Sequence, residues 1–507
     1  MPRGKVSLPL SQGYKQRRMT DTPRYYAAID LGSNSFHMII AQEQDGSLTV
    51  IDRVKEMVQI ARGISSDGDL AEDAKARALD CLACFRERLA EFPASSVRAV
   101  GTKALRSADN SEFLKIAQDA LGHPIETISG YEEARLVYQG VSHSIPQQQG
   151  QTLVVDIGGG STEFIVGHLQ TPLLLESLSL GCVTFSQRYF SDGCSAKAMN
   201  NAYLAACAEL EVISRNYRQC GWDICFGASG TVKAVANYIS DGNNAYIDRE
   251  RLSALYLDVS VNGINASGEL AKLRREVLPA GVAILKAIFD QLHIDSMHVS
   301  DAALKEGLIY DIVGRMSERD IRDQTIAKMT KQYRVDLAQA ERISAFSQAL
   351  LKELPLEEEY HKLIRPAQLL HWAAMVHEIG LTIAHNDYHL HGHYLIRHSD
   401  MAGFSRLEQH WIAQLLRLQR KKLPLTLADN LPNNLSACLL CLRLAILLHR
   451  KRQDLSLGVH LKRNGDTITL WVENLDEHPL TSKNLKQEQE QLAALGLNLE
   501  LSSDKPD

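Results

Sequence analysis

Two short segments of the chain carry the same arrangement of potentially reactive residues. Asp30 ends the apolar run 26–30 and precedes Leu-Gly-Ser-Asn-Ser, and Asp156 ends the run 153–156 and precedes Ile-Gly-Gly-Gly-Ser. Glycine and small hydroxyl residues after a strand let backbone N–H groups converge on an oxyanion, an approach that a Cβ would block. An aspartate at the strand end suits a divalent cation, directly or through water. Two such loops facing each other would clamp a polyanion with a metal between them.

The repetition favours this hypothesis over a simpler one. A single Asp-x-Gly-x-x-Ser segment would be interpreted as an ordinary hairpin turn, but two copies after apolar strands indicate a functional pair. The predicted metal is Mg²⁺ (or Mn²⁺), held by Asp30, Asp156 and Glu163, with several waters retained. The first copy has His37 where the second has Glu163, so the acidic site is asymmetric. The predicted phosphate-binding residues are Gly32, Ser33, Asn34, Ser35, Gly158, Gly159, Gly160 and Ser161.

Alternating strands and helices surround both loops. A repeat of this kind predicts two homologous α/β halves, which we place at residues 25–137 and 138–320. In the first half we expect strands at 26–30, 36–42, 48–54, 97–102 and 125–129, with helices at 70–92, 111–121 and from 132. In the second half we expect strands at 153–156, 163–167 and 173–179, with strand-to-helix turns at 224–231 and 297–301.

The pattern changes near residue 320. Leu, Ala, Gln and Arg at helical spacing dominate from there to about residue 450, which predicts an all-helical domain over 321–452. Apolar and polar residues alternate in 459–471, which predicts a small α/β appendage over 453–507. Residues 1–24 are polar and basic without an apolar segment, and we expect a disordered leader there.

Composition excludes some classes of protein. The chain has 507 residues and a net charge of −6, which argues against a dedicated DNA-binding protein, so we expect no nucleic-acid partner. The nine cysteines have no framework spacing, which predicts a cytoplasmic protein with free thiols; peripheral association with the inner membrane face is left open. Two Cys-x-x-Cys pairs lie in helical stretches, at Cys81/Cys84 and Cys438/Cys441. We predict core packing for them, with a zinc or redox site as the alternative.

Seven motifs in order resemble a known family. They are "AAIDLGSNSFHM", "GTKALR", "ISGYEEARLVYQGV", "VVDIGGGSTEF", "LGCVTF", "GASGTVKA" and "SDAALKEGLIYDI". The duplicated hairpins resemble the phosphate loops of the actin, sugar-kinase and heat-shock ATPase superfamily. The full set resembles the exopolyphosphatase / guanosine pentaphosphate phosphohydrolase family over roughly residues 25–320, and "WAAMVHEIGL" and "HSDMAGFS" extend the resemblance. It implies an α/β fold of two actin-like (ribonuclease H-like) domains followed by an all-helical HD-like domain and the small C-terminal appendage. It also implies a homodimer.

The resemblance also suggests roles for individual residues. It places the general base at Glu133, the glutamate directly before Ala-Arg at the start of a helix. Repulsion by bound phosphates would raise the pKa of this carboxyl, which suits a proton acceptor near neutral pH. The alternative for such a glutamate is a helix-dipole role, which we prefer for Glu132. The resemblance places Arg106 beside the cleft as a fork for phosphate, and a solvated arginine is the alternative.

The chain also departs from its apparent relatives. ATP-using members of the superfamily carry a Gly-Gly pair beside the adenosine, where this chain has Ala302 and Ala303. Their Cβ atoms would crowd a purine, which argues against an ATP-dependent kinase or chaperone. Family members usually have Gly at the position of Ala302 and Arg at that of Lys305.

The helical region carries histidines and basic residues. Seven of the 18 histidines lie between His371 and His398. His377-Glu378 resembles a degenerate His-Asp phosphohydrolase signature, so we favour a relic fold, with a second metal site as the alternative. Basic side chains nearby form either a solvated face or a track for a long polyanion, bound through salt-sensitive electrostatics. These residues are Arg417, Arg420, Lys421, Lys422, Arg450, Lys451 and Arg452.

Three functions fit this sequence. The leading prediction is an exopolyphosphatase that removes terminal phosphates processively from inorganic polyphosphate and releases orthophosphate. The segments "DIGGGSTE", "LSLGCVTF" and "HNDYHLHGHYLI" look closer to that branch, and the basic helices suit a long chain. The alternative is hydrolysis of guanosine pentaphosphate to guanosine tetraphosphate at the same site, and both activities can coexist. The third is a non-catalytic sensor that binds polyphosphate or the guanosine alarmone.

Overall fold

The protein is described by a computed structural model in which the chain forms two compact units, residues 1–318 and 319–507. The predicted leader, 1–24, lies almost entirely outside the described residues. The structure describes residues 7–8, 24–44, 47–64, 69–107, 111–145, 150–239, 246–264, 276–316, 320–356, 365–423, 432–455, 457–465, 467–493 and 497–502.

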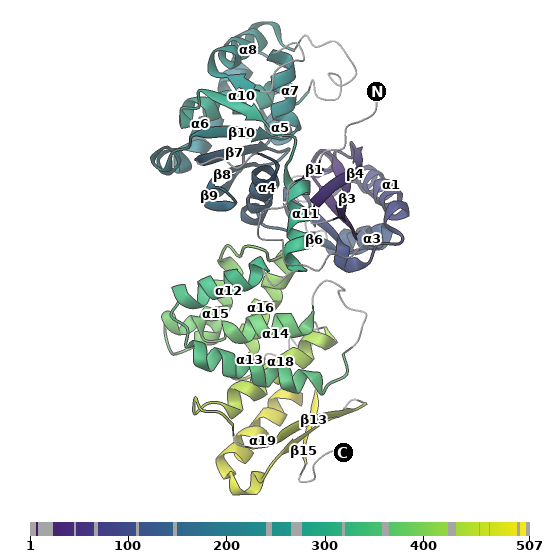
Figure 1. The fold of residues 1–507 in the computed structure, drawn as a ribbon, viewed down its shortest axis with the longest axis vertical. Coiled ribbons are helices and arrows are strands. Elements are labelled where there is room, and N and C mark those ends of the chain that lie inside the picture. Colours follow the sequence, from purple (N-terminus) through teal and green to yellow (C-terminus); the bar gives the residue numbers. More distant parts are fainter. Residues whose placement is uncertain are drawn as a thin grey trace. The chain divides into compact units, whose positions relative to one another are not determined.

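The first sheet contains the first predicted loop. Its strand order is β1-β4-β3-β2-β5-β6 (Figure 1). The neighbours β2 and β3, and β3 and β4, run antiparallel, whereas β5 runs parallel to β2 and β6 runs parallel to β5. Its strands are β1 (Ser7–Leu8), β2 (Arg24–Leu31), β3 (Phe36–Gln44), β4 (Ser47–Glu56), β5 (Val97–Gly101) and β6 (Ile125–Thr127). Its helices are η2 (Ile60–Gly63), α1 (Glu72–Leu89), η3 (Ala94–Ser96), α2 (Lys103–Ser107) and α3 (Ser111–Leu121).

The second sheet repeats this topology. Its order is β11-β12-β10-β7-β8-β9, so β9-β8-β7-β10-β12 corresponds to β4-β3-β2-β5-β6, and β11 is an added antiparallel edge. This correspondence confirms the two duplicated α/β halves. Its strands are β7 (Gln151–Ile157), β8 (Thr162–His168), β9 (Thr171–Leu178), β10 (Ile224–Ala228), β11 (Tyr246–Asp248) and β12 (Ser296–Val299). Its helices are α5 (Cys182–Tyr189), α6 (Ala196–Cys220), α7 (Gly230–Ile239), α8 (Arg249–Asn262) and α10 (Leu278–Leu292).

Two helices join the halves. α4 (Gly130–Ser144) follows the first sheet in sequence but packs on β8 and β9, whereas α11 (Leu304–Arg315) follows the second sheet but packs on β2 and β3. The expected boundary at 137/138 therefore lies inside α4. The helices cross closely, because a Cβ on Gly307 would lie 1.9 Å from the Leu136 carbonyl oxygen and one on Gly140 would lie 2.2 Å from that of Ala303. One apolar cluster accordingly includes residues from both sheets and both helices.

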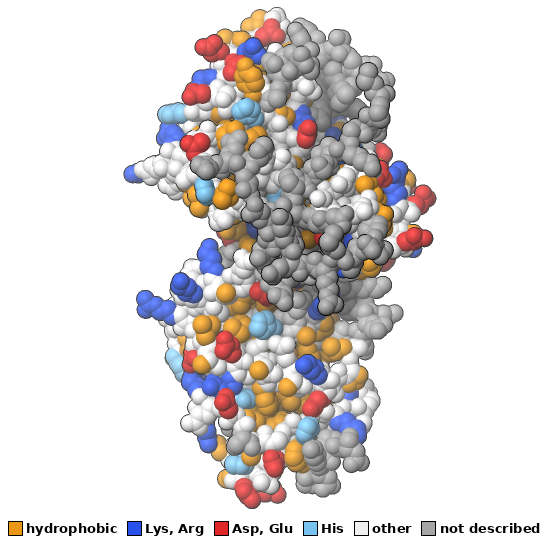
Figure 2. Space-filling view, viewed as in Figure 1, with side chains coloured by type: hydrophobic (Ala, Val, Ile, Leu, Met, Phe, Trp, Pro, Cys, Tyr) orange, Lys and Arg blue, Asp and Glu red, His pale blue; other side chains and the backbone are white. Residues whose placement is uncertain are grey.

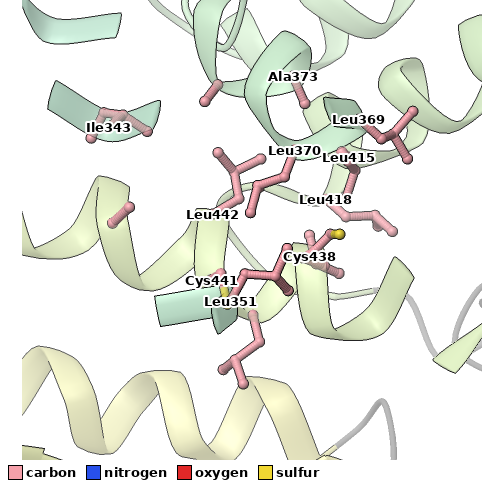
Figure 3. Packing of buried hydrophobic residues seen from close by; sticks show 14 of the residues in the cluster. Ile343, Leu351, Leu369, Leu370, Ala373, Leu415, Leu418, Cys438, Cys441 and Leu442 are labelled. Atoms are coloured by element: carbon pink, nitrogen blue, oxygen red, sulfur yellow. The ribbon is translucent and has the colours of Figure 1, made fainter. Parts of the chain in front are cut away.

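The second unit is helical, as predicted, and ends in a small sheet of order β13-β14-β15. Cys438 and Cys441 pack in its apolar core among leucines such as Leu351 and Leu442 (Figure 3), which confirms core packing for this Cys-x-x-Cys pair. All nine cysteines are free thiols. The helices are α12 (Ile321–Gln332), α13 (Leu337–Lys352), α14 (Pro366–Met375), η4 (Ile379–Thr382), α15 (Tyr388–His398), α16 (Arg406–Leu418), α18 (Asn433–Leu448), η5 (Leu475–Glu477) and α19 (Pro479–Ala493). The strands are β13 (Val459–Asn464), β14 (Thr467–Val472) and β15 (Asn498–Ser502).

The surface carries both signs of charge. Figure 2 shows Lys and Arg side chains interspersed with Asp and Glu over the described part of the visible face, as the small net charge leads one to expect. Among the helices that the structure describes, none is both long and apolar enough to cross a membrane.

Candidate active site

The two predicted loops occupy equivalent places in the two sheets. The first connects β2 to β3 and the second connects β7 to β8, each at the end of an antiparallel pair. Asp30 pairs in register with His37 across β2 and β3, and Asp156 pairs with Glu163 across β7 and β8. The asymmetry noted in the sequence therefore falls on one structural position. His37 Nε2 lies 2.8 Å from Ser35 Oγ, within the first loop.

Small residues let the two loops approach each other. A Cβ built on Gly159 would lie 2.9 Å from the Cβ of Ser33, closer than real side chains pack, so this position requires glycine. The second loop is closed by a hydrogen bond from the Gly158 amide to the Ser161 carbonyl, at 2.8 Å. The sequence thus places two short, flexible-backbone turns side by side, as the clamp hypothesis requires.

Both loops line one pocket of about 250 Å³, the active-site pocket. It brings together every predicted catalytic, phosphate-binding and metal-ligating residue except Arg106. The predicted residues that line it are Asp30, Gly32, Ser33, Asn34, Ser35, Glu133, Asp156, Gly158, Gly159, Gly160, Ser161 and Glu163.

The carboxyl groups of this pocket repel one another. Burial, followed by the charges of Glu306 and Glu163, raises the pKa of Asp30 to about 7 against the opposing effect of Lys305. Burial is also the main cause that raises the pKa of Asp156 well above its ordinary value, with Glu163 and Asp30 adding to it. Burial raises the pKa of Glu163 as well, although hydrogen bonds from Ser177 and Ser161 oppose the shift. A bound cation would relieve this repulsion.

Glu133 lies in the first turn of α4. The helix begins after β6, and its N-cap is Ser129, whose side chain accepts a hydrogen bond from the Glu132 amide at 3.1 Å. Glu133 is 8% exposed, and its Oε2 has no hydrogen-bond partner among the described residues. Burial and the nearby charge of Glu163 raise the pKa of Glu133 well above its ordinary value, although Arg106 opposes the shift. This carboxyl therefore lines the pocket with one buried oxygen that has no hydrogen-bond partner in the described structure.

Glu132, the neighbouring glutamate, has a different environment. It is fully buried and forms ion pairs with Arg135, at 2.7 Å, and with Arg98, at 3.8 Å. Glu132 lies in the first turn of α4, where the helix-dipole interpretation expects it, and it also belongs to a buried ion network. Arg135 also bonds Asp311 on α11, so it is a structural partner of this helix.

Arg106 stands beside the pocket rather than in its lining. Its Nη1 lies 3.7 Å from Glu133 Oε2, and it donates a hydrogen bond to the Ile128 carbonyl. The lysine three residues earlier in the same motif, Lys103, was not predicted as a site residue. Its Nζ donates to the Gly160 carbonyl at 2.8 Å and to Ser179 Oγ at 3.1 Å, so it bridges the first half to the second loop. Its position one helical turn before Arg106 was the available signal.

Other cations of the pocket also escaped prediction as site residues. Lys55, Lys233 and Lys305 line it, from β4, α7 and α11 respectively. Lys305 stood out only as a departure from the family pattern. Lys233 lies in the motif "GASGTVKA" but was not predicted as a site residue, whereas Lys55 lies in none of the motifs quoted above. The assembled sheets bring the two lysines to one pocket.

The residues fit a divalent cation of the kind that keeps most of its waters. In the described ranges, no three His, Cys, Asp or Glu side chains form a ready-made metal cage. Mg²⁺ is usually held by one or two carboxylates together with substrate phosphates, so such a cage is not required. Asp30 Oδ1 is buried without a hydrogen-bond partner in the described structure, beside Asp156 and Glu163.

The basic residues predicted as a polyanion track in the helical unit differ in exposure and in their contacts. Lys422, Arg450 and Lys451 are exposed. Lys421 pairs with Asp387. Arg417 and Arg420 are half-buried, and Arg420 lies 4.6 Å from the centre of the Tyr388 ring.

The histidine motif of this unit also makes structural contacts. Arg452 bonds Glu378 at 2.7 Å and Asp336 at 2.9 Å. His377 is buried, with its Nδ1 2.7 Å from the Ala374 carbonyl. Glu378, which stands in the degenerate His-Asp motif, thus pairs with an arginine.

Comparisons with known proteins cover almost the whole chain. Residues 39–316 match the Ppx/GppA phosphatase family, and residues 321–489 match the Ppx/GppA phosphatase domain III. A Vibrio cholerae protein named guanosine-5′-triphosphate,3′-diphosphate pyrophosphatase is 38% identical over 493 residues, 94% of this chain and 98% of its own length.

Two solved structures share the fold. An exopolyphosphatase from Cytophaga hutchinsonii is 23% identical with a TM-score of 0.51, covering 57% of this chain and 98% of its own. An exopolyphosphatase-like protein is 22% identical with a TM-score of 0.52, covering 58% and 98%.

Proposed function

Because the chain belongs to the Ppx/GppA phosphatase family, we propose that it hydrolyses the terminal phosphoanhydride bond of guanosine pentaphosphate, releasing orthophosphate and leaving guanosine tetraphosphate. The observation that carries this choice is the 38% identity, over nearly the full length of both chains, to a relative named for a guanosine 5′-triphosphate,3′-diphosphate. Polyphosphate was the leading substrate predicted from the sequence, and the similarity to this relative supports the reverse order.

The pocket supplies what such a reaction needs. Phosphoryl transfer requires neutralised phosphate charge, positioning of the phosphate and a group that orients the nucleophile. The loop amides and hydroxyls around Ser33 and Gly159 would hold the terminal phosphate. Lys305 and Lys233 line the same space and add positive charge.

Glu133 would act as general base. In the reaction, a water oxygen forms a bond to the terminal phosphorus, the bridging P–O bond breaks, and the bridging oxygen remains on the tetraphosphate. Glu133 accepts the proton that the water loses. Its buried site gives it a raised pKa, which makes its ionised form a stronger proton acceptor than an ordinary glutamate. Arg106, 3.7 Å away, would favour that ionised form.

Asp30, Asp156 and Glu163 would hold Mg²⁺ or Mn²⁺, which neutralises charge on the phosphate oxygens when bound. The three carboxyl groups lie in one pocket with raised pKa values, an arrangement that a cation stabilises. A carboxyl that binds a metal must be ionised, so metal binding to these groups would release the protons that their raised pKa values retain.

Polyphosphate is the second candidate substrate. It presents the same terminal phosphoanhydride, and the exposed side chains of Lys422, Arg450 and Lys451 in the helical unit favour a long anionic chain. The catalytic groups would be the same for both substrates. A purely sensory role is less well supported, because Glu133, Asp156 and Glu163 all reach the pocket.

Product analysis tests the proposed reaction. The purified protein is incubated with guanosine pentaphosphate and Mg²⁺, and anion-exchange chromatography separates the products. We expect guanosine tetraphosphate and orthophosphate in equal amounts. Release of pyrophosphate, or an unchanged nucleotide, would contradict the proposal.

A further inference from the structure

A second pocket adjoins the active-site pocket. It has a volume of about 650 Å³ and is lined by residues of β3, β4, β10 and β12 and by the segment that follows β12. We call it the side pocket, and its characteristic residues are Arg53, Lys55, Lys233, Asp301, Lys305 and Glu306. Lys55, Lys233 and Lys305 line both pockets, so the two pockets adjoin at these side chains.

The two pockets differ in charge. The active-site pocket has five carboxylates and three lysines in its lining, whereas the side pocket has four Lys or Arg side chains and two carboxylates. A phosphate in the active-site pocket therefore benefits from a metal cation. The side-pocket lining carries a net positive charge of about two and can bind phosphate oxygens directly. Three of its cations, Lys55, Lys233 and Lys305, are shared with the active-site pocket, and Arg53 is the one that it adds.

The ion pairs of the side pocket are ready to be replaced by an anion. Lys233 bonds Asp301 at 2.8 Å, but the Asp301 side chain is 98% exposed, and exposed pairs of this kind contribute little stability. Arg53 bonds Glu306 at 2.9 Å while 42% of the Arg53 side chain is exposed. Glu306 also accepts from the Ala303 amide at 2.8 Å and lies 3.3 Å from Lys305, so it keeps partners if Arg53 turns to a ligand.

We propose that the side pocket is a second phosphate-binding subsite, which holds the phosphate groups of the substrate that are not cut. This inference rests on the proposed function, under which those groups are the 3′-diphosphate of the nucleotide. The same chemistry would take inner phosphates of a polyphosphate chain, and the substrates used below distinguish the two sources. The subsite selects substrates with phosphates at two places and rejects a simple nucleoside triphosphate.

Arg53 is the residue to change, because it lines the side pocket and not the active-site pocket. Arg53→Gln is compared with Arg88→Gln as matched control, since Arg88 pairs with Asp52 near the same strand and lines neither pocket. Arg53→Lys keeps the charge and tests for rescue. Melting temperatures of all variants show whether loss of the Arg53–Glu306 ion pair lowers the stability of the protein.

KM and kcat for phosphate release are measured with guanosine pentaphosphate and with GTP, which lacks the 3′-diphosphate; GTP is scored as a competitive inhibitor if it is not cleaved. We expect Arg53→Gln to raise KM for guanosine pentaphosphate about tenfold, equivalent to about 1.4 kcal/mol, with kcat within about twofold and no change for GTP. Arg53→Lys should restore most of the affinity, and Arg88→Gln should behave as wild type. Equal effects on both nucleotides, or no effect on either, would overturn the subsite.

Long polyphosphate and tripolyphosphate form the second comparison. If the protein cleaves only polyphosphate, the proposed nucleotide reaction fails. The subsite still stands in that case if Arg53→Gln raises KM for the long chain and leaves tripolyphosphate unchanged. Equal changes in KM for long polyphosphate and tripolyphosphate would rule out the subsite for polyphosphate as well.

Discussion

At the residue scale, the pocket concentrates acidic groups where an anionic substrate must bind. Four carboxyl groups, on Asp30, Glu133, Asp156 and Glu163, have raised pKa values, in each case chiefly because desolvation disfavours the ionised form. Repulsion by neighbouring carboxylates adds to the shift for Asp30, Glu133 and Asp156. Such an arrangement costs stability, and a group of perturbed carboxyls in a cleft is for that reason a candidate functional site. Under the proposed function, a cation held by three of them and proton transfer at the fourth would give the four carboxyl groups distinct functions.

The base assignment is tested by Glu133→Gln. We expect kcat to fall by about 10²–10⁴ while substrate binding stays within about threefold, because the amide keeps the shape but accepts no proton. Glu132→Gln is the matched contrast. It disrupts a buried ion pair with Arg135 and should lower the melting temperature more than it lowers kcat. Phosphate release by Glu133→Gln at the wild-type rate would refute the role of this residue.

The metal role predicts a requirement for Mg²⁺ or Mn²⁺. Phosphate release should stop in excess chelator and return when either ion is added back, because Asp30, Asp156 and Glu163 cannot themselves neutralise phosphate charge. Asp156→Asn should raise the Mg²⁺ concentration needed for half-maximal rate by about tenfold. Full activity in chelator would remove the metal from the account.

At the element scale, the crossing of α4 and α11 fixes the position of Glu133. The crossing depends on Gly307, where an added Cβ would lie 1.9 Å from the Leu136 carbonyl oxygen, and backbone must therefore move. We expect Gly307→Ala to destabilise the protein by about 1–3 kcal/mol. Gly314 lies on the same helix with no atom within 4 Å of its added Cβ, so Gly314→Ala should be neutral or stabilise by about 0.5–1 kcal/mol. Chemical denaturation measures both, and equal effects would disprove the packing argument.

The same two helices share a buried ion network with β5, centred on Asp311. Burial alone would raise the pKa of Asp311, but the guanidinium groups of Arg98, Arg315 and Arg135 hold it far below its ordinary value. A depressed pKa contributes stability that is complete above the unfolded-state pKa of about 4 and is lost as the pH falls through the folded-state pKa.

Wild-type protein should therefore lose stability steeply below about pH 4, and Asp311→Asn, already destabilised by about 3–5 kcal/mol, should lose less over that interval. Melting temperatures measured from neutral pH to about pH 2 give the comparison. Parallel curves for the two proteins would show that the network does not carry this pH dependence.

These elements also show how far sequence reasoning reached. The repeated Asp-Gly-Ser turns predicted the two sheets and their pocket, because the turn chemistry is local to each segment. The interchange of α4 and α11 was not predicted, since each helix packs on the sheet to which it does not belong in sequence. Lys103, Lys55 and Lys233 were not predicted as site residues. Lys103 and Lys233 lie in the motifs "GTKALR" and "GASGTVKA", but their contacts with the other half of the chain arise from three-dimensional packing, as do those of Lys55.

At the scale of the whole molecule, each unit has its own apolar core. The net charge of −6 is compatible with the proposed, highly anionic substrate, because capture would depend on loop amides, a cation and a few placed side chains. The net negative charge argues against a protein that binds polyanions over a broad basic surface. It is compatible with a protein that binds them in one pocket.

The most direct test of the account compares two substrates with one enzyme. Initial rates of orthophosphate release from guanosine pentaphosphate and from long polyphosphate are measured in parallel with Mg²⁺, for wild type and Glu133→Gln. We predict that kcat/KM for the nucleotide exceeds that for polyphosphate by about tenfold or more, and that Glu133→Gln loses both activities. Preference for polyphosphate, or release that survives Glu133→Gln, would contradict the account.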